Sequence, residues 1–330
     1  MSRSRWPRVL RMVLGSVALA GATGSVRPAP ERASVPPATR VEDTRSVACG
    51  ACHPAEHAAW SRSAHHLAGT DPLFTRELET AMEPAWCTGC HAPLGASEVA
   101  REEGVGCAVC HVRDGVVLSP SVSGRAPHAS VASSLAAAES CAPCHQFHFS
   151  AASSHGIDPS LWLQDTMREH ADSAFADRPC SSCHDPHVLP GHTDPALLSR
   201  ALAVQTRVAR TRSATRVTLR IRADVVGHAV PTGDLLRELV VRAWPLGHPE
   251  RAQSEVLGRA LPAVAPGRRI EAIPDARIPP RGSRDVTLTL PGHHAHVAWD
   301  ITLTALPAGH ERARGLPEHL LRWPVVSGQD

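Results

Sequence analysis

One five-residue pattern, Cys-x-x-Cys-His, accounts for every cysteine in this sequence. The ten cysteines form five pairs, and a histidine follows each pair directly. The cysteines are Cys49, Cys52, Cys87, Cys90, Cys107, Cys110, Cys141, Cys144, Cys180 and Cys183, and the histidines are His53, His91, His111, His145 and His184. Thiols and imidazoles bind metals, and thiols also form covalent bonds, so the pattern indicates a metal centre or a covalently held group.

The pattern is typical of c-type haem attachment, in which two thioether bonds hold the haem and the histidine becomes the proximal iron ligand. Zinc is a poorer explanation, because two such cysteine pairs already supply the four ligands of a zinc site. A histidine after each pair is then not required. A thioredoxin-like redox pair would occur once, near a βαβ pattern, and a disulfide framework would not repeat one word five times. We therefore expect five covalently attached haems c.

The segment that must position these groups, residues 47–202, has few long apolar runs. Five haems in this segment leave about 31 residues for each, too few to bury a large core of side chains. We expect a mostly α-helical or irregular chain wrapped around the haems, which themselves form the core. Folding should then depend on haem attachment, as small metal domains depend on their metal.

Residues 203–330 have a different pattern of apolar and polar residues and contain no cysteine. Apolar and polar residues alternate in TRVTLRIRADVV, RELVVRAWP, SRDVTLTLP and AHVAWDITLTAL, with turn residues such as IPPRGS between them. Short alternating segments without a helix pattern between them predict an all-β sandwich. The predicted fold class is therefore mixed, a multihaem cytochrome c domain followed by a β-sandwich domain.

The N-terminus predicts export. Basic residues precede the apolar run MVLGSVALAG, and Ala18 and Ala20 near its end offer small residues for cleavage. These features predict a signal peptide over 1–20 and a Pro/Ala-rich linker over 21–46. A retained single-helix anchor is the alternative. The expected location is the periplasm or another exported compartment, and the formal net charge of +2 gives no reason to expect nucleic acid as a partner.

Distal iron ligands should come from the histidines outside the five motifs. His65 follows Trp60 and Ser61, His128 lies in a stretch beside a proline, His187 follows the fifth motif, and His228 lies in GHAVPTGD, which predicts a tight turn. Each could equally be a surface residue. A fifth distal ligand is less well indicated, and the candidates are His148, His155, His170, His192, Met82 and Met167.

The ordered phrases CGACHPAEHAAWSRSAHH, CTGCHAP, EGVGCAVCH, CAPCHQF, CSSCHDPH and GHAVPTGD resemble the multihaem cytochromes c related to the tetrahaem cytochrome of nitrifying bacteria. That group is in turn related to hydroxylamine oxidoreductase and pentahaem nitrite reductase. The subset with a C-terminal β-rich domain and a Gly-His-x-x-Pro-Thr-Gly turn resembles this chain over roughly residues 47–245. The resemblance implies that His65 is a distal haem ligand, and we extend that role to His128, His187 and His228. It also implies that motifs close in sequence, such as 87–91 and 107–111, hold neighbouring haems that pass electrons.

The resemblance includes enzymes, so two functions are open. Pentahaem nitrite reductases typically hang the catalytic haem on Cys-x-x-Cys-Lys, and hydroxylamine oxidoreductases use a tyrosine cross-link; this chain has neither lysine nor tyrosine. We therefore favour an electron carrier with mostly bis-histidine haems and no catalytic residue. Its expected partners are redox proteins of the periplasm or cell envelope, with membrane contact only through a partner or a retained anchor. The alternative is an oxidoreductase with one open haem, acting on a small nitrogen or sulfur compound.

Two features of the β domain leave further alternatives. The sandwich is either a docking module or a lid that covers one haem and contributes His228. The cluster His293, His294 and His296 in PGHHAHVAW is a solvated loop or a transition-metal site.

Overall fold

The computed structural model describes residues 45–330, with gaps at 82, 96, 123, 134, 136–137, 151–155, 263–267, 311–312 and 314. The expected signal peptide and nearly all of the expected linker lie outside the described residues, as do Met82 and His155. The described residues contain helices and several sheets, so the mixed class expected from the sequence is present. Within this part of the chain, no helix combines the length and the apolar composition that a bilayer span requires.

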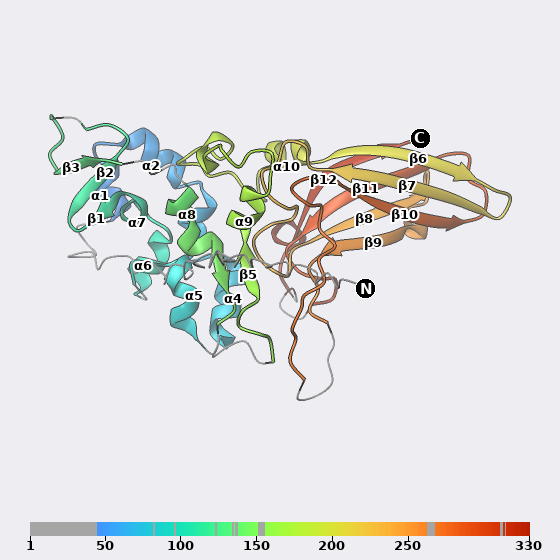
Figure 1. The fold of residues 1–330 in the computed structure, drawn as a ribbon, viewed down its shortest axis with the longest axis horizontal. Coiled ribbons are helices and arrows are strands. Elements are labelled where there is room, and N and C mark those ends of the chain that lie inside the picture. The colour runs from blue at the N-terminus through green and yellow to red at the C-terminus, as the bar shows by residue number, and fades with distance from the viewer. Residues whose placement is uncertain are drawn as a thin grey trace, which may run out of the picture. The chain divides into compact units, whose positions relative to one another are not determined.

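Short helices dominate the first part of the chain (Figure 1). Prolines at the first turn begin several of them, and Asp71, Ser97 and Asp194 each accept a hydrogen bond from a backbone N–H of the helix that they precede. The helices are α1 (Ser46–Gly50), α2 (Pro54–Trp60), α3 (Ala64–Leu67), α4 (Pro72–Thr80), α5 (Pro84–His91), α6 (Glu98–Glu103), α7 (Cys107–His111), α8 (Ala138–His145), α9 (Thr166–Ala171), the 3-10 turn η2 (Cys180–Ser182) and α10 (Pro195–Ala201).

Two small sheets lie among these helices. Strands β1 (Val112–Arg113), β2 (Val116–Ser119) and β3 (Ser130–Ala132) form one sheet, in which β2 and β3 are parallel. Strands β4 (Gln146–His148) and β5 (Trp162–Asp165) form an antiparallel pair directly after the fourth motif.

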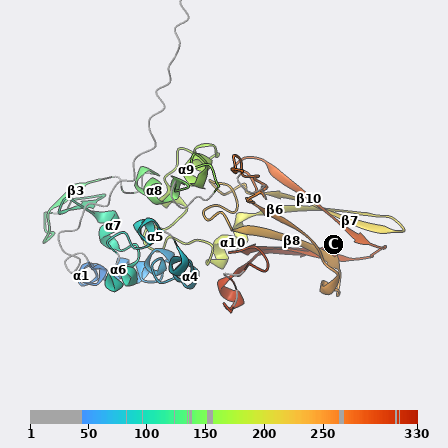
Figure 2. The same ribbon diagram turned by 90° about the horizontal axis from the view of Figure 1, so that it is seen from below.

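Two antiparallel sheets make up the rest of the chain. One has the order β10-β7-β6 and the other β12-β11-β8-β9, and Figure 2 shows them as separate layers. The strands are β6 (Ala203–Arg210), β7 (Ala214–Arg222), β8 (Glu238–Pro245), β9 (Gln253–Gly258), β10 (Ser283–Pro291), β11 (Val297–Thr304) and β12 (Arg322–Gln329), with 3-10 turns η3 (Pro249–Arg251) and η5 (Glu318–Leu320). Strand β7 alternates buried and accessible side chains along its length, as expected for a strand with one face in a core.

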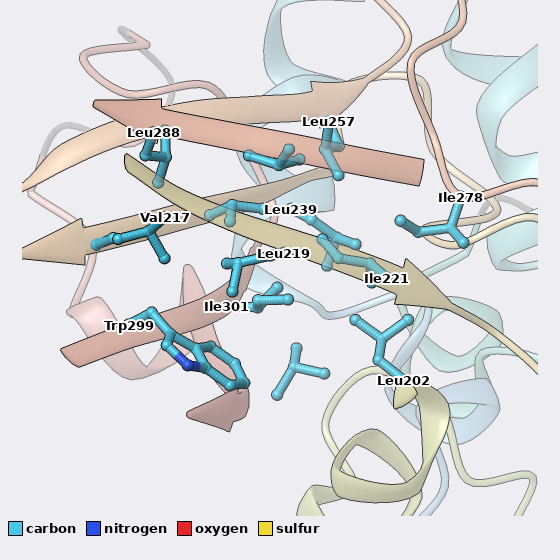
Figure 3. Packing of buried hydrophobic residues seen from close by; sticks show 14 of the residues in the cluster. Leu202, Val217, Leu219, Ile221, Leu239, Leu257, Ile278, Leu288, Trp299 and Ile301 are labelled. Atoms are coloured by element: carbon cyan, nitrogen blue, oxygen red, sulfur yellow. The ribbon is translucent and has the colours of Figure 1, made fainter. Parts of the chain in front are cut away.

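The main hydrophobic core lies between these two sheets (Figure 3). Leu219 of β7, Leu239 of β8 and Ile301 of β11 are almost fully buried there, and Leu198 and Leu202 from around α10 join them. Residues 45–194 contrast with this sandwich. Their buried apolar side chains, among the described residues, are only Trp60, Phe74, Ala92, Ala100, Ala108 and Val109. The helical part therefore has little side-chain core of its own.

Candidate haem-binding sites

The motifs lie on helical turns. Helix α5 ends with the second motif, α7 consists of the third, and α8 ends with the fourth. On a helix, residues three and four positions apart share one face, so both cysteines and the histidine of a motif point to the same side. This arrangement suits two covalent attachments and one axial ligand to a single planar group.

Backbone carbonyls orient the motif imidazoles. The Nδ1 atom lies 2.9 Å from Ala68 O in His91, 2.9 Å from Leu118 O in His111 and 2.7 Å from Pro190 O in His184. Because a carbonyl oxygen can only accept, Nδ1 carries the proton and donates it. The unprotonated Nε2 is then free to bind a metal, which is the usual arrangement of a metal-bound histidine.

Three motif histidines face a second histidine ring from a distant part of the chain. His145 and His65 have ring centroids 6.2 Å apart. The separation is 6.2 Å between His111 and His187, and 6.3 Å between His184 and His228. Two imidazoles that bind one metal through bonds of about 2.0 Å, with each centroid about 1.1 Å behind its nitrogen, have centroids about 6.2 Å apart. Each gap is therefore wide enough for one metal ion that could bind both imidazoles.

The buried histidines are held in the form that binds metal. Burial lowers the pKa of His65 and of His228, and lowers the pKa of His145 to about 4. These imidazoles are therefore neutral near pH 7. A metal ligand must have an unprotonated nitrogen, so no proton has to be displaced when such a ring coordinates iron.

The loop before the third motif places His65. Trp60 Nε1 donates to Val105 O at 2.9 Å, and Val105 N donates to His65 O at 2.8 Å. Gly104, with φ of +57°, makes this approach possible because a Cβ there would lie only 2.6 Å from His65 O. The Trp60 element that the resemblance singled out thus ties helix α2 to the loop that fixes the backbone of His65.

The second motif has different surroundings. The ring of His91 stacks on Phe74, with centroids 4.0 Å apart and an angle of 2° between the planes. Among the described residues, no other histidine ring faces His91 or His53 at the separation of the three pairs. Sequence reasoning missed Phe74, because a phenylalanine in a short helix resembles any core residue.

Arg237 lies near these groups and has no ion-pair partner among the described side chains. Its Nη1 donates to Thr232 O at 3.4 Å, and the pKa of Arg237 is lowered by burial. Burial, and then the charge of Arg237, lower the pKa of His192 to about 3. Gln164 Oε1 is buried without a hydrogen-bond partner in the described structure. The local sequence does not predict the burial of Arg237, because an arginine directly before a strand usually lies at the surface.

Cysteines from different motifs also meet. The side chains of Cys49 and Cys107 are hydrogen-bonded, which lowers the pKa of Cys107 to about 6 and raises that of Cys49. Cys141 and Cys180 form a second such pair. The first motif therefore adjoins the third, and the fourth adjoins the fifth.

The other described candidate residues do not face a motif histidine at the separation of these pairs. His128 is exposed, and its Nδ1 lies 3.0 Å from Ser130 Oγ. His148 stacks on Trp162, and His192 meets Trp323 edge-on. His170 lies against Gly227, and Met167 N donates to Gln146 Oε1.

The histidine cluster of the β domain does not form a metal centre in the described structure. His294 Nε2 lies 2.8 Å from Pro291 O, and His296 Nδ1 lies 3.3 Å from Asp330 O. No group of three or more potential ligands gathers around one point anywhere in the described residues.

Comparison with known proteins identifies the fold. No family model and no curated protein matches the chain. A solved structure, the penta-heme cytochrome c552 from Thermochromatium tepidum, aligns over 87% of this chain and 98% of its own with a TM-score of 0.67 and 20% identity. A second, the putative ApaA protein from Bordetella pertussis, aligns over 39% of this chain and 89% of its own with a TM-score of 0.19 and 12% identity, too low to indicate a common fold. The chain therefore shares the fold of a multihaem cytochrome c.

Proposed function

We propose that this protein is an exported pentahaem c-type cytochrome that transfers electrons between redox partners of the periplasm or cell envelope. The ten motif cysteines would attach five haems, and the five motif histidines would be their proximal ligands. The observation that carries the proposal is the set of three facing histidine pairs, each with a gap that suits one iron. The backbone-bonded Nδ1 atoms of His111 and His184 and the lowered pKa of His145 agree with ligation through Nε2.

The role of electron carrier follows from the axial positions, which the facing histidines would fill. Bound haem iron supplies one-electron chemistry, whose potential the protein tunes through axial ligands and burial. Where a histidine occupies both axial positions, no substrate can reach the metal. The meeting of Cys49 with Cys107 and of Cys141 with Cys180 supports attachment sites close enough for electrons to pass between neighbours.

One observation favours a second function, an oxidoreductase acting on a small nitrogen or sulfur compound. His91 has a stacked phenylalanine and no facing histidine among the described residues, so the opposite side of its metal could accept a substrate. The charge of Arg237, unmatched by a bonded carboxylate, and the buried His192 would suit an anion.

One experiment separates these functions. The protein is produced with a haem-attachment system, haem is counted as the pyridine haemochrome, and the reduced protein is mixed with nitrite, hydroxylamine or tetrathionate. A carrier has five haems and shows reversible reduction without turnover. Turnover of one of these compounds supports the oxidoreductase, and a protein without covalent haem rules out both.

A further inference from the structure

We propose that Glu169 and Arg277 are positioning residues that hold the turn carrying His228 in place opposite His184, so that the β part of the chain completes one haem site. The inference rests on the proposed function, because it assigns His228 to the iron of the fifth motif. It goes further in naming the buried ion pair that fixes this ligand.

Glu169 of α9 forms hydrogen bonds with the turn at two points. Its side chain is buried, and Oε2 accepts hydrogen bonds from Ala229 N at 3.2 Å and from Thr232 Oγ1 at 2.6 Å. Ala229 follows His228 directly, and His228 Nδ1 lies 2.9 Å from Ala229 O. One carboxylate oxygen therefore fixes the backbone that carries the imidazole and the far side of the same turn.

Arg277 holds the turn from the other side. Its guanidinium is also buried, and Nη1 donates to Glu169 Oε1 at 2.6 Å and to Pro231 O at 3.2 Å. Asp275 anchors the guanidinium in turn, with Nη2 to Oδ2 at 2.7 Å. Paired backbone hydrogen bonds of 2.9 Å join Val230 to Ile278, the residue after Arg277. The turn is thus fastened to α9 and to the segment before β10.

A role in positioning the turn explains the buried charges of Glu169 and Arg277 better than a role in stability does. A buried ion pair adds little to stability compared with apolar side chains of the same volume, whereas loss of one partner leaves an uncompensated charge. Axial ligation, however, depends on a bond of about 2.0 Å, and residues that orient a ligand typically change metal affinity 10- to 100-fold when they are mutated. Three hydrogen bonds to the side chains of Glu169 and Arg277 and two to the backbone of Ile278 hold this one short turn and supply that precision.

The test compares variants of the mature holoprotein by low-temperature EPR and near-infrared magnetic circular dichroism. H228A defines the signature of the affected haem as a high-spin signal that added imidazole converts to low spin. We expect E169A to produce the same imidazole-sensitive signal, with five haems still attached. E169Q retains the side-chain volume and should give a partial change if E169A does not fold. R277K, which retains the charge, should be closer to wild type than R277A.

Two comparisons make the result decisive. The double variant E169A/H228A should match H228A alone, because both changes act on one ligand. R242Q removes an ion pair to Asp300 in the same sandwich, away from the turn, and should leave all spectra unchanged. Wild-type spectra for E169A and E169Q, with H228A altered, overturn the positioning role. Unaltered spectra for H228A overturn the assignment of His228 as a ligand, and this inference with it. A wild-type protein without covalently attached haem would instead refute the proposed function.

Discussion

The imidazole of His111, which ends the third motif, lies nearly parallel to that of His187, with centroids 6.2 Å apart and an angle of 7° between the planes. Seventy-six positions separate the two residues in the sequence. Of the four distal candidates, His65, His187 and His228 each face a motif histidine, whereas His128 is bonded to Ser130 at the surface.

Replacement of His187 should therefore open one iron. In H187A the facing ring is lost, and we expect one haem in five to become high-spin in the EPR spectrum while the haem count stays unchanged. H128A is the matched control and should retain the wild-type spectrum. A change in H128A together with an unchanged H187A would show that the third motif takes its ligand elsewhere.

The chain without haem should fold only in part. The main apolar core lies in the sandwich and α10, whereas residues 45–194 bury few large apolar side chains. When the full chain is produced without haem attachment, limited proteolysis should cut within residues 45–194 and leave a resistant fragment that contains 203–330. Equal protection of both parts would contradict the dependence of the helical part on haem.

Truncation of a core side chain should destabilise the sandwich. Leu219 is fully buried between the sheets, so L219A should lower the free energy of unfolding by about 2–5 kcal/mol. V256A removes a half-exposed side chain on β9 and should change it by less than about 0.5 kcal/mol. Chemical denaturation followed by far-UV circular dichroism measures both values. Similar losses in the two variants would argue against a common core between the sheets.

Gly104 should be sensitive to the smallest addition. Its φ is +57°, and a Cβ would meet the backbone oxygens of His65 and His66 at 2.6 and 2.3 Å. G104A should cost about 1–3 kcal/mol of stability and should alter the spectrum of the haem bound by His65. Gly124 has open space around it, so G124A should alter neither. Loss of stability without a spectral change would show that the loop containing Gly104 does not determine the position of His65.

Local patterns predicted much of the β part. The alternating segments expected as strands coincide with β7, β8, β10 and β11, each of which has one face in the core. Strands β6, β9 and β12 were not among the expected segments. Four consecutive residues of β9 are exposed, and Pro324 and Gly328 interrupt β12. At such edges, pairing with a neighbouring strand decides the structure more than the pattern does.

Spacing alone predicts the five haem motifs, because attachment of haem c requires two cysteines three positions apart and a histidine directly after the second. It does not predict the partner of each motif histidine, since His65 faces the fourth motif and not the first, which it follows. Glu169 and Arg277 gave no local signal either, because charged residues usually lie at the surface. Their roles arise only from contacts between distant segments.

The proposed carrier holds five haems, of which three have two histidine ligands each. Pyridine haemochrome quantification combined with EPR spin counting of the oxidised, mature protein tests it most directly. We expect five haems per chain, with at least three low-spin and bis-histidine. Fewer than five haems, or fewer than three low-spin irons, would contradict the proposed set of haem sites.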